Sequence, residues 1–302
     1  MSVMSSPLRR PAAVAALALV ATLAIPTAAQ AAAPAHRGST SHSSIAQHHH
    51  HAPFAVRTTV VPKTAVKAFG GGVLYEPQDT GKPVLGAVVI TPGFTDTNAD
   101  EKEYAELVAS QGFVAFAIDT LDVGDIPADR STQMLAAADW LTGSSPVKHE
   151  VSPDRVGLIG FSFGGGGVMR AAQSRPSIKA AVALMPFDSA PDDDPNASAP
   201  AYPKMTTPTL VITGQKDDVA VPADFGKPAY DSIPAGTPKQ YLELTGLGHG
   251  AGEHVPAPTI RVAVTAFLKR FLDGNHEYTK FICPAPKVEG PISASLSSCP
   301  KG

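Results

Sequence analysis

The sequence predicts an α/β fold with a mostly parallel central sheet and helices on both faces. From Phe54 onward, short apolar runs rich in β-branched residues alternate with amphipathic stretches of helical length. The runs are continuously apolar, which is expected of strands buried on both faces of a parallel sheet. The length of 302 residues, less an export segment, also suits one large α/β domain with a single deep core.

Seven apolar runs are expected to form the strands, and five amphipathic stretches are expected to form the helices. The strands are expected at Gly72–Tyr75, Ala87–Thr91, Val114–Ile118, Arg155–Ile159, Ala180–Leu184, Thr209–Thr213 and Gln240–Leu244. The helices are expected at Glu101–Gln111, Ser131–Thr142, Gly164–Ser174, Ala223–Ser232 and Ala257–Leu272. Ligands of such sheets bind at the carboxyl ends of the strands, so chemistry is expected in the loops that follow these runs.

The N-terminal region is expected to be an export signal followed by a leader. Arg9 and Arg10 precede an apolar stretch and a group of small residues, as in a secretory signal peptide. Pro26 ends the apolar stretch well short of the ~20 residues that a membrane-spanning helix needs. We therefore expect a signal peptide over 1–31, secretion, a disordered leader over 32–52 and one catalytic α/β domain over 53–302.

Charge and cysteine content narrow the partners and cofactors. The formal net charge of −3 predicts neither a nucleic-acid partner nor an anionic membrane surface, and we expect a monomer. Cys283 and Cys299 are the only cysteines, and two thiols of an exported chain normally form a disulfide. Without a histidine cluster beside them, neither a zinc site nor another cofactor is expected. The run His48-His49-His50-His51 fits a solvated linker, with a metal-binding tract or an engineered tag as alternatives.

The strongest chemical signal is Gly160-Phe161-Ser162-Phe163-Gly164, which has the G-x-S-x-G pattern of a nucleophile elbow. It follows an expected strand and precedes an expected helix, a context that argues against a chance match in a glycine-rich chain. In such an elbow a strained turn exposes the serine hydroxyl, and the glycines leave room for neighbouring backbone. Ser162 is therefore predicted as the nucleophile, and the Phe163 amide as one donor to an oxyanion.

A serine hydroxyl becomes an effective nucleophile when a base takes its proton and an acid orients that base. Two adjacent carboxylates, Asp217 and Asp218, follow the expected strand that ends at Thr213. Neighbouring side chains on an extended loop point in opposite directions, so one of the two is the expected acid. Asp217 is favoured because Asp218 already begins the next turn, and the alternative is a solvated loop residue.

The base is expected after the following strand. His249 stands there among glycines, whereas His254 is the alternative five residues further on, beside Glu253. The resulting order of nucleophile, acid and base is Ser162, Asp217, His249. This order is the one found in α/β-hydrolases, which agrees with the predicted fold.

A second oxyanion donor is expected in the loop after an early strand. Gly93 would let the backbone approach a ligand, so the Phe94 amide is predicted as that donor; an ordinary proline–glycine turn is the alternative. Phe94, Phe161, Phe163 and Phe187 all lie near strand ends. They predict an aromatic substrate cleft, although buried aromatic residues more often belong to a core.

These motifs resemble those of the bacterial cutinases and polyester hydrolases, including enzymes that hydrolyse poly(ethylene terephthalate). The resemblance covers residues 53–300 and rests on Gly93-Phe94-Thr95, Gln111-Gly112-Phe113-Val114, Ile118-Asp119-Thr120, Gly160 to Gly167, Pro186-Phe187-Asp188-Ser189, Lys269 to Asp273 and Phe281-Ile282-Cys283-Pro284. It implies Ser162, Asp217 and His249 as the triad, Phe94 and Phe163 as oxyanion donors, and a terminal disulfide between Cys283 and Cys299. It also implies an ester or polyester substrate.

The chain departs from the family pattern at the cleft. Members usually have tyrosine at 94, histidine or tryptophan at 161, methionine at 163 and tryptophan at 187, where this sequence has phenylalanine. Asp192-Asp193-Asp194 lies in an insertion expected to reshape the cleft edge, with cation binding as the alternative. The stretch 185–208 is too short for a large lid, which favours an open groove. A lipase or broad carboxylesterase, and a secreted binding protein without activity, are the alternative functions.

Overall fold

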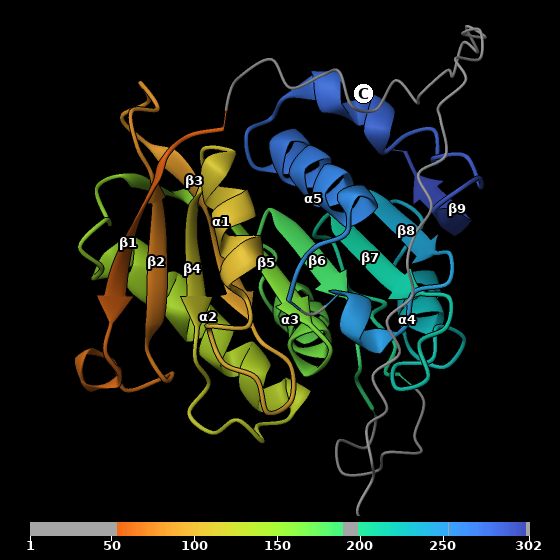
Figure 1. Ribbon diagram of the computed structural model, residues 1–302, viewed down its shortest axis with the longest axis horizontal. Coiled ribbons are helices and arrows are strands. Elements are labelled where there is room, and N and C mark those ends of the chain that lie inside the picture. Colours follow the sequence, from red (N-terminus) through yellow and green to blue (C-terminus); the bar gives the residue numbers. More distant parts are fainter. Residues whose placement is uncertain (1–52, 190–198, 253, 300–302) are drawn as a thin grey trace, which may run out of the picture. The chain divides into compact units, whose positions relative to one another are not determined.

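The computed structural model describes residues 53–189, 199–252 and 254–299. The predicted signal peptide and leader, the run His48–His51 and the acidic insertion at 192–194 lie outside these residues. Within them, one nine-stranded sheet forms the centre of the fold (Figure 1).

The sheet has the strand order β1-β2-β4-β3-β5-β6-β7-β8-β9. Its strands are β1 Val56–Val61, β2 Gly72–Pro77, β3 Leu85–Thr91, β4 Val114–Ile118, β5 Val151–Phe161, β6 Ala180–Leu184, β7 Thr209–Gly214, β8 Lys239–Leu244 and β9 Ile292–Ser298. The strands from β4 to β8 in this order pair in parallel, whereas β1, β2 and β9 form antiparallel pairs. The carboxyl ends of the parallel strands therefore share one edge of the sheet.

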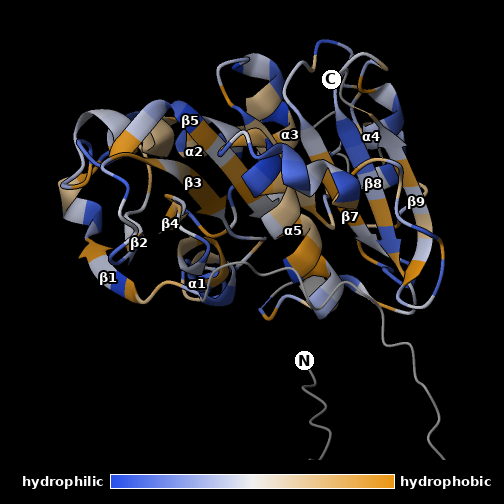
Figure 2. Ribbon diagram, turned by 90° about the horizontal axis from the view of Figure 1, so that it is seen from above, coloured by the Kyte–Doolittle hydropathy of each residue, from blue (hydrophilic) through white to orange (hydrophobic). Residues whose placement is uncertain are grey.

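In the described ranges, five α-helices cover the two faces of this sheet. They are α1 Lys102–Ser110, α2 Pro127–Gly143, α3 Phe163–Ser174, α4 Gly226–Ser232 and α5 Pro258–Phe271. One apolar cluster joins α1 and α5 to one face, and a second joins α2, α3 and α4 to the other. Figure 2 shows this division, with apolar residues frequent along the central strands between the two helix layers.

The structure confirms the predicted α/β architecture. Each of the seven expected strands and five expected helices is present, with ends that differ by a few residues. The largest shifts are at the starts of β5 and α2, each four residues before the predicted start; α2 begins at Pro127 because a proline suits the first turn of a helix. In the described part of the β6–β7 connection no helix forms a lid.

Two strands were not predicted, and both lie at sheet edges. β1 has three exposed residues and two that are only partly buried, and β9 has the polar sequence Ile-Ser-Ala-Ser-Leu-Ser-Ser. A disulfide joins Cys283 to Cys299 at the end of β9, which confirms the predicted bridge. Ser298, next to that cysteine, pairs with Lys239 at the amino-terminal end of β8. The bridge therefore lies away from the carboxyl ends where chemistry is expected.

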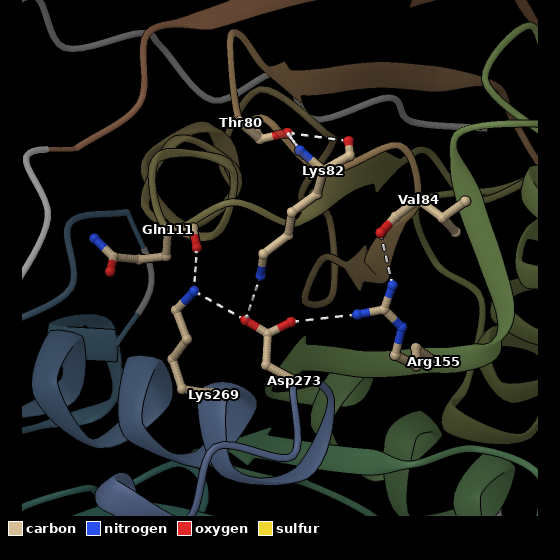
Figure 3. A network of polar contacts seen from close by, with 7 residues as sticks. All are labelled: Thr80, Lys82, Val84, Gln111, Arg155, Lys269 and Asp273. Carbon is tan, nitrogen blue, oxygen red and sulfur yellow. Dashed lines mark hydrogen bonds and ion pairs between the residues drawn. The ribbon is translucent and has the colours of Figure 1, made fainter.

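A polar network at the amino-terminal side of the sheet fixes the end of α5 (Figure 3). Asp273 accepts from Lys269 of α5 at 3.0 Å and forms ion pairs with Lys82 and Arg155. Lys269 also donates to the Gln111 carbonyl at 2.6 Å, and Arg155 donates to the Val84 carbonyl at 2.7 Å. The network thus links α5 to β5 and to the β2–β3 loop.

Candidate active site

Ser162 occupies the turn between β5 and α3, at the centre of the carboxyl edge. Its φ of 51° and ψ of −116° are strained for a residue with a side chain. The turn is held by the Ser162 amide, which donates to the Leu184 carbonyl, and by the Ser162 carbonyl, which accepts from Phe187 and Gly166. The strained elbow predicted from the pentapeptide is therefore present.

Close backbone contacts explain the two glycines of the elbow. A Cβ on Gly160 would collide with the backbone of Gly164, and a Cβ on Gly164 would collide with the carbonyl oxygens of Thr91 and Pro92. Neither glycine has a positive φ, so close approach and not conformational freedom requires them. The turn can therefore be this tight only with glycine at both positions.

Three side chains form a continuous hydrogen-bonded chain at this edge. Ser162 Oγ lies 2.9 Å from His249 Nε2, and His249 Nδ1 lies 2.8 Å from Asp217 Oδ2. The serine follows β5, the aspartate follows β7, and the histidine begins a short 3-10 helix after β8. The Asp217 side chain is fully buried, whereas the His249 side chain is 16% exposed. The imidazole thus links a fully buried carboxylate to the hydroxyl of Ser162, a residue that is 6% exposed.

The alternatives left open by the sequence occupy other positions. Asp217 Oδ1 accepts from the amides of Val219 and Ala220 at 3.0 and 2.7 Å, which fixes the carboxylate, whereas Asp218 is exposed. His254 is more than half exposed, and its Nδ1 lies 3.7 Å from an oxygen of Asp100. The structure brings Asp217 and His249, and not their neighbours, to Ser162.

The two predicted oxyanion donors come from adjacent loops. Phe163 is the first residue of α3, so its amide has no acceptor within the helix. The turn after β3 carries Phe94, and within the described chain the Phe94 amide makes no hydrogen bond. The following residue, Thr95, has a φ of 68°, an uncommon conformation for a β-branched residue. Neither amide has a hydrogen-bond partner within the described chain, so both remain candidates for the oxyanion donors.

Four phenylalanine rings form a row beside the serine. Ring centroids are 5.3 Å apart for Phe94–Phe163, 5.3 Å for Phe163–Phe187 and 4.3 Å for Phe187–Phe225. Phe94 is 53% exposed at one end of the row, and Phe225 is buried at the other. Phe225 was not predicted, because it lies before α4 with no local signal that it would stack on Phe187.

Phe161 differs from the other predicted cleft residues. Its side chain is buried, and its ring lies 5.0 Å from the imidazole of His249. It therefore packs against the proposed base and is not part of the row of four rings.

A buried polar cluster holds the loop that carries Phe187. Asp188 accepts from Arg170 Nε at 2.8 Å and from the Tyr202 hydroxyl at 2.5 Å, and Arg170 also donates to the Ser189 carbonyl. These partners come from α3 and from both ends of the β6–β7 connection. No spacing in the sequence indicated this cluster, since its members are brought together only by the fold.

The described residues also bear on metal and membrane binding. Among them, no group of three or more histidine, cysteine, aspartate or glutamate side chains is arranged to hold a metal ion. No helix in the described ranges is long and apolar enough to cross a membrane.

A parallel sheet with a strained serine elbow and a Ser–His–Asp chain in this order has the features of serine hydrolases with the α/β-hydrolase fold. The model of the PET hydrolase-like family matches residues 29–300. The chain belongs to this family.

Curated relatives support the assignment over nearly the whole chain. The chain is 39% identical over 292 residues to a bis(hydroxyethyl) terephthalate hydrolase of Streptomyces coelicolor, covering 96% of this chain and 90% of that protein. It is 36% identical to a cutinase of Thermobifida fusca (95% and 93% covered) and 38% identical to cutinase est2 of Thermobifida alba (90% and 88%). The predicted family resemblance and the predicted carboxylic ester hydrolase class are thereby confirmed.

Proposed function

We propose that the protein is a secreted serine esterase that hydrolyses carboxylic esters, including polyesters of the cutin and terephthalate kinds. The observation that carries the proposal is the unbroken chain from Ser162 through His249 to Asp217 at 2.9 and 2.8 Å. The relatives named as cutinases and as a terephthalate ester hydrolase support ester and polyester substrates.

In the proposed reaction, Ser162 Oγ attacks the ester carbonyl carbon while His249 Nε2 takes the hydroxyl proton. This requires the neutral imidazole with its proton on Nδ1, which the buried Asp217 carboxylate favours by accepting that N–H. The carbonyl oxygen becomes an oxyanion that accepts hydrogen bonds from the Phe94 and Phe163 amides.

Collapse of the tetrahedral intermediate breaks the carbon–oxygen bond, and His249 gives its proton to the departing alcohol. Water then attacks the acyl group on Ser162 with His249 again as base. The carboxylic acid leaves, and the serine hydroxyl is restored. The chemistry needs no metal or other cofactor.

Exposed apolar side chains near the triad support an insoluble polymer as substrate. Phe94, Leu121, Val123 and Val219 are each about 44–53% exposed. Val219 donates its amide to Asp217, and the Val123 carbonyl accepts from the amide next to Phe94, so these residues lie on loops attached to the site. Burial of these apolar side chains against an apolar polymer chain would remove them from water, which favours binding of the polymer.

The test measures hydrolysis of a short nitrophenyl ester, of cutin, of an aliphatic polyester film and of a terephthalate polyester film in parallel. Wild-type protein should release products from the nitrophenyl ester and at least one polyester, and Ser162→Ala should reduce both rates at least about 10⁴-fold. Faster hydrolysis of emulsified triglyceride than of any polyester would instead favour a lipase. Failure of the wild type to react with a fluorophosphonate would favour a binding protein without activity.

A further inference from the structure

Arg130 of α2 is a fully buried arginine that takes no part in the proposed proton transfers. Its guanidinium donates to three backbone carbonyls: Nε to Asp125 at 2.7 Å, Nη1 to Pro92 at 3.0 Å and Nη2 to Val123 at 2.7 Å. A buried guanidinium needs such acceptors because a lost hydrogen bond there is costly. All three acceptors lie in the β3–α1 and β4–α2 loops, beside the proposed oxyanion donor Phe94.

The contacts of Arg130 lie on both sides of the Phe94 amide. Pro92, whose carbonyl accepts from Nη1, stands two residues before Phe94. The Val123 carbonyl accepts both from Nη2 and, at 2.9 Å, from the amide of Thr95, the residue after Phe94. The planar fork of an arginine can hold both segments at once, which a lysine ammonium cannot match geometrically.

The held segment is strained and lies directly against the elbow. The φ of 68° at Thr95 would relax if nothing opposed it. On its other side, the carbonyls of Thr91 and Pro92 abut Gly164, where no side chain would fit. The Arg130 contacts therefore fix the distance between the loop of Phe94 and the first turn of α3, which supplies the Phe163 amide.

Nearby carboxylates offset part of the cost of burying this charged side chain. Burial lowers the pKa of Arg130 to about 10, against the favourable effect of nearby Asp125, Asp96 and Asp122. The guanidinium therefore stays protonated at neutral pH and keeps its donors.

We infer that Arg130 is a positioning residue that holds the Phe94 amide at the distance from the Phe163 amide that an oxyanion requires. The inference rests on the proposed function, and it assigns Arg130 no contact with the substrate. Its expected signature is a loss in kcat with little change in KM, since an oxyanion donor contributes mainly in the transition state.

The test compares Arg130→Lys and Arg130→Met with Lys239→Met. Lys239 is a suitable control because it too is a buried cation that donates to backbone carbonyls, those of Tyr230 and Ile233, at the far end of β8. Active enzyme is counted by fluorophosphonate labelling of Ser162 carried to completion, so that unfolded protein does not enter kcat. Each variant is assayed on a soluble nitrophenyl ester and against a phenylboronic acid, which forms a tetrahedral adduct with the serine.

We expect Arg130→Met to lower kcat per labelled site about 30- to 100-fold, with KM within about threefold, and to raise the boronate inhibition constant in parallel. Arg130→Lys should lose less, about 10-fold, and Lys239→Met should keep kcat within about twofold. If Arg130→Met does not fold, the loss in Arg130→Lys relative to Lys239→Met decides. A twofold or smaller change in kcat for the folded Arg130 variants, or an equal loss in the control, overturns the inference. In either case, labelling of Ser162 would leave the proposed function standing.

Discussion

Replacing the proposed acid by its isosteric amide, Asp217→Asn, tests the triad most sharply. Asp217 Oδ1 accepts from two amides, at 3.0 and 2.7 Å, and Oδ2 accepts from His249. An asparagine would keep its oxygen on the two amides, because turning it would leave those amides facing an NH₂ group. The NH₂ group must then face His249 Nδ1.

The NH₂ group of the asparagine donates, so His249 can form a hydrogen bond with it only if Nδ1 carries no proton and accepts. The ring proton moves to Nε2, which points at Ser162 Oγ from 2.9 Å and can no longer accept the hydroxyl proton. With the base in the wrong tautomer, kcat should fall about 10⁴-fold, equivalent to about 5 kcal/mol of transition-state stabilisation. The fold should change little, since both amide hydrogen bonds survive.

The assay is kcat and KM on a nitrophenyl ester, with the free energy of unfolding from a denaturant titration of the same variant. Asp218→Asn is the matched control: its side chain is exposed, and its kcat should stay within about twofold of the wild type. A loss below about tenfold in Asp217→Asn, or a larger loss in Asp218→Asn, would refute the assignment of the acid.

Three further predictions concern packing and the terminal bridge. Gly164→Ala should lower the free energy of unfolding by about 3 kcal/mol because the new methyl group meets two carbonyl oxygens. The control Gly143→Ala in α2 has nothing within 4 Å of the new Cβ, and it should raise the free energy of unfolding by about 0.5–1 kcal/mol. Thermal unfolding of the two variants compares these effects. The double change Cys283→Ser and Cys299→Ser opens a bridge of sequence separation 16 and should cost about 3 kcal/mol, with kcat at 25 °C unchanged. Phe225→Ala removes the ring whose centroid lies 4.3 Å from that of Phe187, and it should lower the free energy of unfolding by about 3 kcal/mol. It should also lower the rate of aromatic polyester hydrolysis relative to that of nitrophenyl ester hydrolysis. An unchanged ratio of these rates would show that Phe225 does not contribute to substrate binding.

The parallel strands were predictable because a strand buried on both faces consists of consecutive apolar residues. β6, for example, is Ala-Ala-Val-Ala-Leu, with every residue buried. The edge strands have no continuous apolar run, because one side of β1 and much of β9 remain accessible to solvent. The pairing of β9 with β8 depends on a partner some fifty residues earlier, which no local pattern of β9 specifies.

The same distinction applies to the site. Ser162, Asp217 and His249 each follow a strand that was recognisable from its sequence, so their convergence followed from the topology alone. Arg130 and Phe225 could not be found in this way. The Arg130 contact with Pro92 spans 38 residues and joins a helix to a loop, so its acceptor becomes visible only in the folded chain.

Backbone strain is concentrated where the proposed chemistry takes place. Among the described residues other than glycine, positive φ angles occur at Asp79 and at Thr95, Ser162 and Met185, and the last three follow the carboxyl ends of β3, β5 and β6. These three strands are neighbours at the centre of the sheet, so the strain lies in adjacent turns. Each strained turn costs of order 1–3 kcal/mol and persists only where surrounding contacts oppose its relaxation.

The opposing contacts differ between the three turns, which makes the arrangement testable. The Leu184 carbonyl holds the amide of Ser162, the Ile212 carbonyl holds the amide of Met185, and the Val123 carbonyl holds the amide of Thr95. The first two acceptors belong to buried strands, whereas Val123 lies in a loop and its carbonyl also accepts from Arg130. Thr95 is therefore the strained turn whose acceptor lies in a loop, which Arg130 and Gln133 of α2 hold, and loosening of the site should begin there in the Arg130 variants.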